Sequence, residues 1–163
     1  MTRIGLLSDT HSFLDDKVFT HFEHVDEIWH AGDFGVGVDD RLAGFKPLRG
    51  VYGNIDGQDI RLSFPETLRF RVEECDVIMQ HIGGYPGRYA PGVRTVLQAE
   101  HPKLFISGHS HILKAIPDKA LGLLHLNPGA AGKHGWHKVR TLMRFSISGA
   151  RIHDLEVIEL AGR

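Results

Sequence analysis

The chain has 163 residues, of which 42% are hydrophobic and 24% charged, and its formal net charge is −1. These values argue against a disordered or membrane-spanning chain, and the lack of a basic excess argues against a dedicated nucleic-acid binder. The start "MTRIGLLSDTH" turns polar too soon for a signal peptide, and the single Cys75 cannot form an internal disulfide. We therefore expect a cytoplasmic protein folded as one domain over residues 1–163.

The first half of the chain alternates short apolar strands with helices. Strands are expected at 3–8, 27–32 and 48–53, and helices at 15–25 and 39–45. This alternation of strands and helices predicts parallel strands that are covered by helices.

The second half is richer in strands. "TLRFRV" (67–72) alternates at period two, "CDVIMQH" (75–81) is of the buried type, and "EECD" between them predicts a turn. A helix is expected at 92–101. The remaining predicted strands are 103–108, 113–118, 122–127, 141–147 and 151–160. The chain therefore predicts an α/β fold in which two sheets pack face to face with helices outside.

Five of the predicted strands run into turn-forming segments that carry Asp, Asn or His. In chain order these residues are Asp9 and His11, Asp33, Asn54 and Asp56, His81, and His109 and His111. The carboxyl ends of parallel strands lie along one edge of a sheet, where ligands bind. We therefore expect these separate segments to converge on one place.

Apart from Asp56, these residues form a coherent set of metal ligands. Two carboxylates, one amide oxygen and four imidazoles suit Mn, Fe, Ni, Zn or Co, whereas Mg and Ca prefer oxygen alone. Seven side chains exceed the need of one ion, and with one bridging carboxylate they supply two sites, the usual arrangement for hydrolysing phosphate esters. Each residue alone is typical of a turn or a helix cap. The joint pattern favours the metal site.

The motifs "DTH", "GD", "GNID", the lone histidine after strand 75–81 and "GHSH" resemble the signature of the calcineurin-like metallophosphoesterases. The short chain and "LNPGAAG" (126–132) are similar to the small bacterial and archaeal phosphodiesterase branch. The resemblance implies a four-layer αββα sandwich, two divalent transition-metal ions, with Mn first and Ni, Fe or Zn as alternatives, and a homodimer or homotetramer. By position, it assigns the first ion to Asp9, His11, Asp33 and His111, and the second to Asp33, Asn54, His81 and His109, with Asp33 bridging.

The resemblance also implies a phosphoric ester hydrolase acting on a small or nucleotide-like phosphodiester. A hydroxide bridging two metal ions would attack phosphorus, so no protein nucleophile is required. The catalytic roles fall to Asp33, Asn54 and Asp56. Asp56 is expected to orient an imidazole or, alternatively, to form a turn.

Two positions depart from the wider family pattern. Ile55 and Gly83 stand where many relatives have histidine. With Ile55 a good general acid is missing, so we expect a bias towards activated or phenolic diesters, whereas Gly83 changes the substrate side of the site. In the loop 83–92, Arg88 is the candidate phosphate contact, with solvent exposure as the alternative. The loop residues Lys133, His134 and His137 are expected in solvent, with a phosphate or a subunit partner as the alternative.

Two further functions stay open. One is a non-catalytic metal-binding scaffold, because the scaffold subunit of the retromer coat resembles the same family with some ligands lost. The other is a nuclease, against which stand the near-neutral charge and the lack of appended domains.

Overall fold

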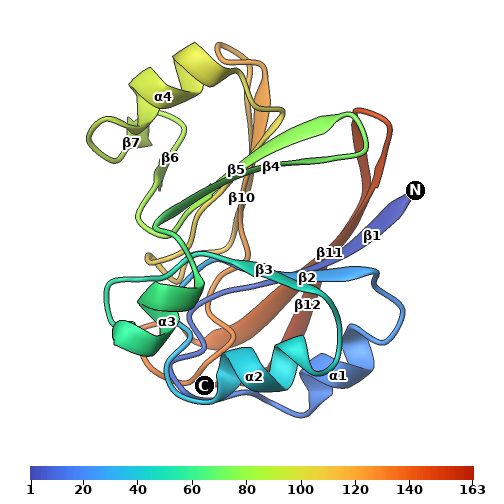
Figure 1. The fold of residues 1–163 in the computed structure, drawn as a ribbon, viewed down its shortest axis with the longest axis vertical. Helices are drawn as coiled ribbons and strands as arrows, with labels where there is room; N and C mark the ends of the chain where they lie inside the picture. The colour runs from blue at the N-terminus through green and yellow to red at the C-terminus, as the bar shows by residue number, and fades with distance from the viewer.

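Two five-stranded sheets form the centre of the structure, a computed structural model that describes residues 1–163 (Figure 1). The first sheet has the order β12-β11-β1-β2-β3 and the second the order β4-β5-β8-β10-β9. The strands of the first sheet are β1 (Thr2–Leu7), β2 (Glu27–His30), β3 (Leu48–Gly50), β11 (Val139–Ser148) and β12 (Arg151–Gly162). Those of the second are β4 (Thr67–Val72), β5 (Cys75–Gln80), β8 (Leu104–Ile106), β9 (Lys114–Asp118) and β10 (Leu123–Asn127).

Both sheets are mixed, with a parallel centre. In the first sheet β1, β2 and β3 run parallel, and in the second β5, β8 and β10 do so. The other strands pair antiparallel with their neighbours: β11 with β1 and with β12 in the first sheet, and β4 with β5 and β9 with β10 in the second. The parallel strands of each sheet therefore end on one side, which is where the predicted site residues follow them.

Alternation along the strands builds the layers. In β1, Ile4 and Leu6 belong to the apolar cluster between the sheets, whereas Leu7 belongs to the cluster beneath the helices. Gly5 lies between them on the helix side, where an added Cβ would meet the Phe22 ring at 2.8 Å. The missing side chain lets this helical layer pack directly on the strand.

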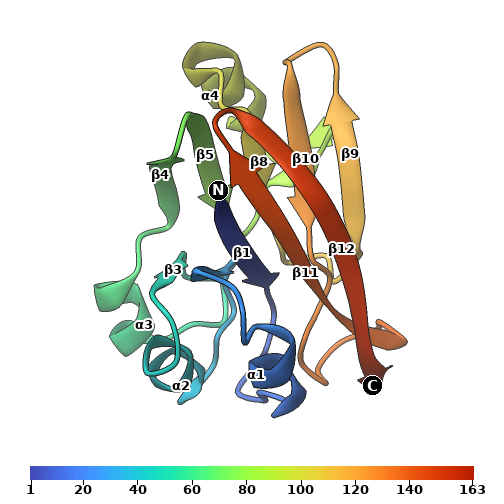
Figure 2. The same cartoon turned by 90° about the vertical axis from the view of Figure 1, so that its right-hand side faces the viewer.

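Four short helices, α1 to α4, cover the outer faces of the sheets, as Figures 1 and 2 show. The helices α1 (Lys17–His21), α2 (Val38–Ala43) and α3 (Gln58–Ser63) lie against the first sheet, and α4 (Val93–Glu100) lies against the second. The predicted α/β sandwich with helices outside is confirmed. None of the helices is both long and apolar enough to cross a bilayer.

Several strands are shorter than predicted, such as β3 (Leu48–Gly50 against 48–53), and three other elements differ more. α1 covers only part of the predicted 15–25, although Val25 is still buried, because apolar spacing reports burial and not helical hydrogen bonds. α3 was not predicted, since Ile60 is its only buried residue. The predicted loop 83–92 contains a small hairpin of β6 (Gly84–Tyr85) and β7 (Arg88–Tyr89), whose two-residue strands are too short to show alternation.

Candidate metal centre

All seven candidate ligands lie at the carboxyl ends of the parallel strands. Asp9 and His11 follow β1, Asp33 follows β2, Asn54 follows β3, His81 follows β5, and His109 and His111 follow β8. Ligand atoms of Asp9, His11 and His111 lie within 4.8 Å of one another, and so do those of Asp33, His81 and His109. The structure therefore contains two groups, each with one carboxylate and two imidazoles.

Asn54 adjoins the second group. Its amide Oδ1 lies 3.0 Å from Nδ1 of His109. This places an uncharged oxygen beside the group that contains Asp33.

Asp33 lies between the two groups. Its Oδ2 is 3.3 Å from Nε2 of His11 in the first group and 3.1 Å from Nε2 of His81 in the second. Its other oxygen, Oδ1, accepts the backbone N–H of Ile55 at 3.0 Å. One carboxylate oxygen is thus held by the loop after β3, and the other faces both groups.

Three ligand atoms of the candidate residues are buried and have no hydrogen-bond partner: Oδ1 of Asp9, Nε2 of His11 and Nε2 of His81. The second oxygen of Asp9 is occupied, because it accepts the Ser8 hydroxyl at 2.6 Å and the His109 N–H at 3.0 Å. Nδ1 of His81 donates to the carbonyl of Ala31 at 2.7 Å, which leaves its Nε2 with a free lone pair. Buried polar atoms are rarely left unsatisfied, so these atoms fit a site that binds metal ions.

The backbone at this site is strained. Nine non-glycine residues have positive φ, and five of them are candidate ligands: Asp9, His11, Asp33, His109 and His111, with φ between 45° and 71°. Each such residue costs roughly 1–3 kcal/mol and persists only where its surroundings fix it, most often at functional sites. This clustering supports a functional role for the loops and is not visible in the sequence.

Glycines allow the loops to approach the ligands closely. A Cβ at Gly53 would fall on the carboxylate and backbone nitrogen of Asp33, and one at Gly32 would fall on the His81 ring. Sequence reasoning missed their role, although "AGD" and "YGN" place both glycines one residue before a candidate ligand.

Buried His30, at the end of β2, supports the same loops and was not predicted to do so. Its Nδ1 accepts the Gly32 N–H at 3.1 Å, and its Nε2 lies 3.0 Å from Oγ1 of Thr10, which donates to the carbonyl of Phe34 at 2.8 Å. Burial lowers the pKa of His30 to about 3, so the imidazole is neutral at physiological pH. It thereby joins the segment after β1 to the segment after β2.

The carboxylates and imidazoles stabilise one another electrostatically. Burial alone raises the pKa of Asp9, but the His11, His111 and His81 imidazoles outweigh it and hold the pKa well below its ordinary value. Burial likewise opposes ionisation of Asp33, and His81 lowers its pKa below the ordinary value. The carboxylates in turn raise the pKa of His11 and of His81. A bound cation would replace these imidazole protons as the positive charge beside the carboxylates.

Asp56 does not orient an imidazole. Its carboxylate accepts the backbone N–H groups of Gly53, Phe34 and Gly35 at 2.9, 3.2 and 3.0 Å. It ties the loop after β3 to the loop after β2, which is the turn role that was the alternative.

A cavity of about 260 Å³ opens over the two groups. Ile55, 46% exposed, lines it together with His134 and Trp136 of the loop after β10. The centres of the His134 and His11 rings lie 4.7 Å apart in a stacked arrangement, so His134 borders the site while it stays exposed to solvent, as the sequence predicts. Arg88 is exposed and does not line this cavity, but it lines a smaller one beside His109.

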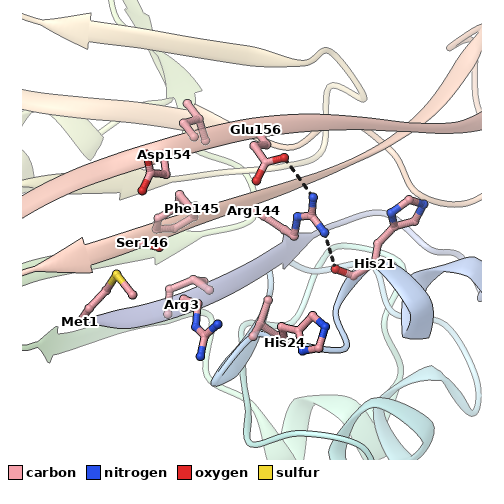
Figure 3. Close-up of a pocket in the computed structure, with 12 residues that line it drawn as sticks. Met1, Arg3, His21, His24, Arg144, Phe145, Ser146, Asp154 and Glu156 are labelled. Atoms are coloured by element: carbon pink, nitrogen blue, oxygen red, sulfur yellow. Dashed lines mark hydrogen bonds and ion pairs between the residues drawn. The ribbon is translucent and has the colours of Figure 1, made fainter.

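The largest cavity, of about 710 Å³, lies elsewhere (Figure 3). Met1 and Arg3 place it at the start of β1, at the opposite end of the strand from Asp9. In Figure 3 the Arg144 guanidinium spans it, donating to the carbonyl of His21 at 2.9 Å and to Glu156 at 3.0 Å. This cavity contains none of the candidate ligands.

Two packed mixed sheets, with carboxylates and imidazoles gathered where their parallel strands end, are features of metal-dependent hydrolases. Residues 2–150 match the calcineurin-like phosphoesterase superfamily domain, and the chain belongs to this superfamily. It is 30% identical over 135 residues to a protein of Methanothermobacter thermautotrophicus described as "Probable metallophosphoesterase", covering 78% of this chain and 76% of that protein.

Solved structures share the fold. An archaeal phosphodiesterase is 21% identical, with a TM-score of 0.76, over 97% of this chain and 99% of that one. Vps29 from Entamoeba histolytica in complex with Zn²⁺ is 16% identical, with a TM-score of 0.73, over 98% of both chains. At these identities the comparisons show that the fold is common to all three.

Proposed function

We propose that this protein is a metal-dependent phosphodiesterase that hydrolyses small or nucleotide-like phosphodiesters. Asp9, His11 and His111 would hold one divalent ion, Asn54, His81 and His109 a second, and Asp33 would bridge them. Bound divalent ions would supply Lewis acidity, a lowered pKa of bound water and neutralisation of charge on the phosphoryl oxygens. The observation that carries the proposal is the convergence of three buried, unpartnered ligand atoms, on Asp9, His11 and His81, beside the inward oxygen of Asp33.

The contribution of the chain itself is positioning. Oδ2 of Asp9 and Oδ1 of Asp33 each accept a backbone N–H, and Nδ1 of His81 donates to a backbone carbonyl. These hydrogen bonds fix the side chains so that the other carboxylate oxygens and Nε2 of His81 are left to bind an ion. Asn54 adds a neutral oxygen, which would limit the negative charge around the second ion. With imidazole and carboxylate ligands together, Mn²⁺, Ni²⁺, Fe²⁺ and Zn²⁺ all suit this set.

Ile55 shapes the expected substrate preference. Its side chain lines the cavity over the two groups, where it offers no proton to a leaving oxygen. Loss of a general acid costs about 10²- to 10⁴-fold for a poor leaving group and less for an acidic one. The enzyme should therefore favour diesters with phenolic or otherwise acidic leaving groups.

A direct test removes bound metal with a chelator, reloads the protein with Mn²⁺, Ni²⁺ or Zn²⁺, and measures metal content by mass spectrometry. Hydrolysis of bis-p-nitrophenyl phosphate is then compared with that of p-nitrophenyl phosphate. We expect two ions per chain, activity that depends on them, and faster turnover of the diester. Metal binding without turnover of either ester would refute the enzymatic proposal.

The likeness to Vps29 supports a second candidate, a non-catalytic metal-binding scaffold of the same fold. This chain has a candidate ligand at all seven positions of the family pattern, which argues against a scaffold that has lost some of them. Metal content near two ions with no hydrolysis of any phosphoester would favour the scaffold.

A further inference from the structure

A smaller cavity adjoins the candidate metal centre. Its volume is about 180 Å³, and its walls include the β6–β7 hairpin and the first residue of β9, Lys114. His109 and Ser110 line both this cavity and the one over the metal groups. Pockets that hold whole small molecules measure ~300 to 1,000 Å³, so this one suits a single chemical group of a larger ligand.

Two cationic residues, Arg88 and Lys114, line this cavity. Tyr85 and Arg88 are directly paired across the hairpin, so their side chains lie on the same face of it. The Lys114 ammonium lies 4.2 Å from the centre of the Tyr85 ring. Tyr85 is thus the cross-strand neighbour of Arg88 and the cation–π partner of Lys114, two residues that come from different segments of the chain.

Neither cation is neutralised by the chain. No Asp or Glu lines the cavity, and neither Arg88 nor Lys114 forms an ion pair or a side-chain hydrogen bond. Other arginines, including Arg49, Arg69 and Arg140, are paired with carboxylates.

The neighbouring carboxylate of Asp118 is engaged elsewhere. It accepts the hydroxyl of Tyr89 at 2.6 Å. Tyr89 follows Arg88 directly, so its side chain lies on the opposite face of the hairpin. The positive charge in the cavity is therefore left for a ligand.

We propose that this cavity binds a second phosphate group of the substrate while the phosphodiester lies over the metal groups. Two uncompensated cations match a phosphate in charge, and an arginine fork matches its geometry. Because His109 and Ser110 line both cavities, the phosphodiester and the second phosphate would be neighbouring parts of one substrate molecule. This inference rests on the proposed phosphodiesterase function and narrows its substrates to diesters that carry a further phosphate.

The test compares two chromogenic diesters, the p-nitrophenyl ester of thymidine 5′-phosphate with and without a 3′-phosphate, using the metal-loaded protein. The readout is the ratio of their kcat/KM values. We expect the added phosphate to raise kcat/KM about tenfold, each of Arg88→Ala and Lys114→Ala to lower that ratio about threefold, and the double variant to bring it near one. The gain should also shrink as ionic strength rises.

Two control variants separate charge in this cavity from general effects. Lys119→Ala removes an exposed lysine of the turn after β9 that lines neither cavity and should keep the ratio. Lys114→Arg should retain most of the gain. A wild-type ratio near one, or a ratio that the Arg88 and Lys114 variants leave unchanged, would overturn the subsite alone. Failure of the wild type to hydrolyse either ester would overturn the proposed function itself.

Discussion

The stability of the fold should depend on pH through one buried histidine that is not a candidate metal ligand, His125 in β10. Its side chain is fully buried, Nδ1 lies 3.2 Å from the carbonyl of Phe105, and Nε2 has no partner. Burial lowers the pKa of His125 from 6.5 to about 4. Between these two values the unfolded chain binds a proton that the folded chain does not, so stability is lost as pH falls through this window.

The size of the effect follows from the two pKa values. From about pH 7.5 to about pH 4.5, proton binding to His125 in the unfolded state alone should lower the free energy of unfolding by roughly 2.5 kcal/mol. Replacing His125 with Asn keeps an N–H near the position of Nδ1 but removes the titrating group. The variant should have a lower free energy of unfolding at neutral pH because packing is lost. Its free energy of unfolding should, however, fall less than that of the wild type between these two pH values, by the amount that His125 contributes.

The measurement is urea denaturation followed by circular dichroism at a series of pH values, with a chelator present so that metal release does not contribute. His24→Asn, at an exposed histidine, serves as the matched control and should leave the pH dependence unchanged. If His125→Asn loses as much stability as the wild type over the same pH interval, burial does not depress the pKa as argued.

Three further predictions concern the candidate site. Asp33→Asn should remove most bound metal and lower diester hydrolysis ~10³-fold or more, because both groups lose a charged ligand; metal content and turnover near wild type would refute the bridging assignment. Gly53→Ala should reduce metal content while circular dichroism stays native, because its Cβ would displace Asp33; Gly57→Ala, with nothing within 4 Å of an added Cβ, is the control, and equal metal content in both would contradict the steric argument. Ile55→His should raise turnover of alkyl diesters by up to about 10²-fold with little change for aryl diesters; unchanged rates would count against a missing proton donor.

The candidate ligands could be predicted because each follows a strand that its own apolar pattern identifies. Asp9 and Asp33 end two such strands, and parallel strands bring their carboxyl ends to one edge of a sheet. The sandwich itself was predictable for the same reason, since strand alternation and helical spacing are local properties of the chain.

Other features arise only from contacts between distant segments. His134 stacks on His11 across more than a hundred residues, and Lys114 meets Tyr85 through a cation–π contact. Asp56 has the turn role that was its alternative, because three backbone N–H groups, two of them from the loop after β2, donate to its carboxylate.

The sequence by itself determined which residue types stand at the ends of which strands, and from this the fold class and the chemistry of the ligands follow. Only the tertiary structure decided which carboxylate oxygen of Asp33 faces both groups, which imidazole nitrogens stay free, and which cations lack a partner. The physical reason is that strand and helix patterns depend on near neighbours in the chain. Ligand orientation and charge compensation depend instead on hydrogen bonds and ion pairs between segments that meet only when the two sheets pack together.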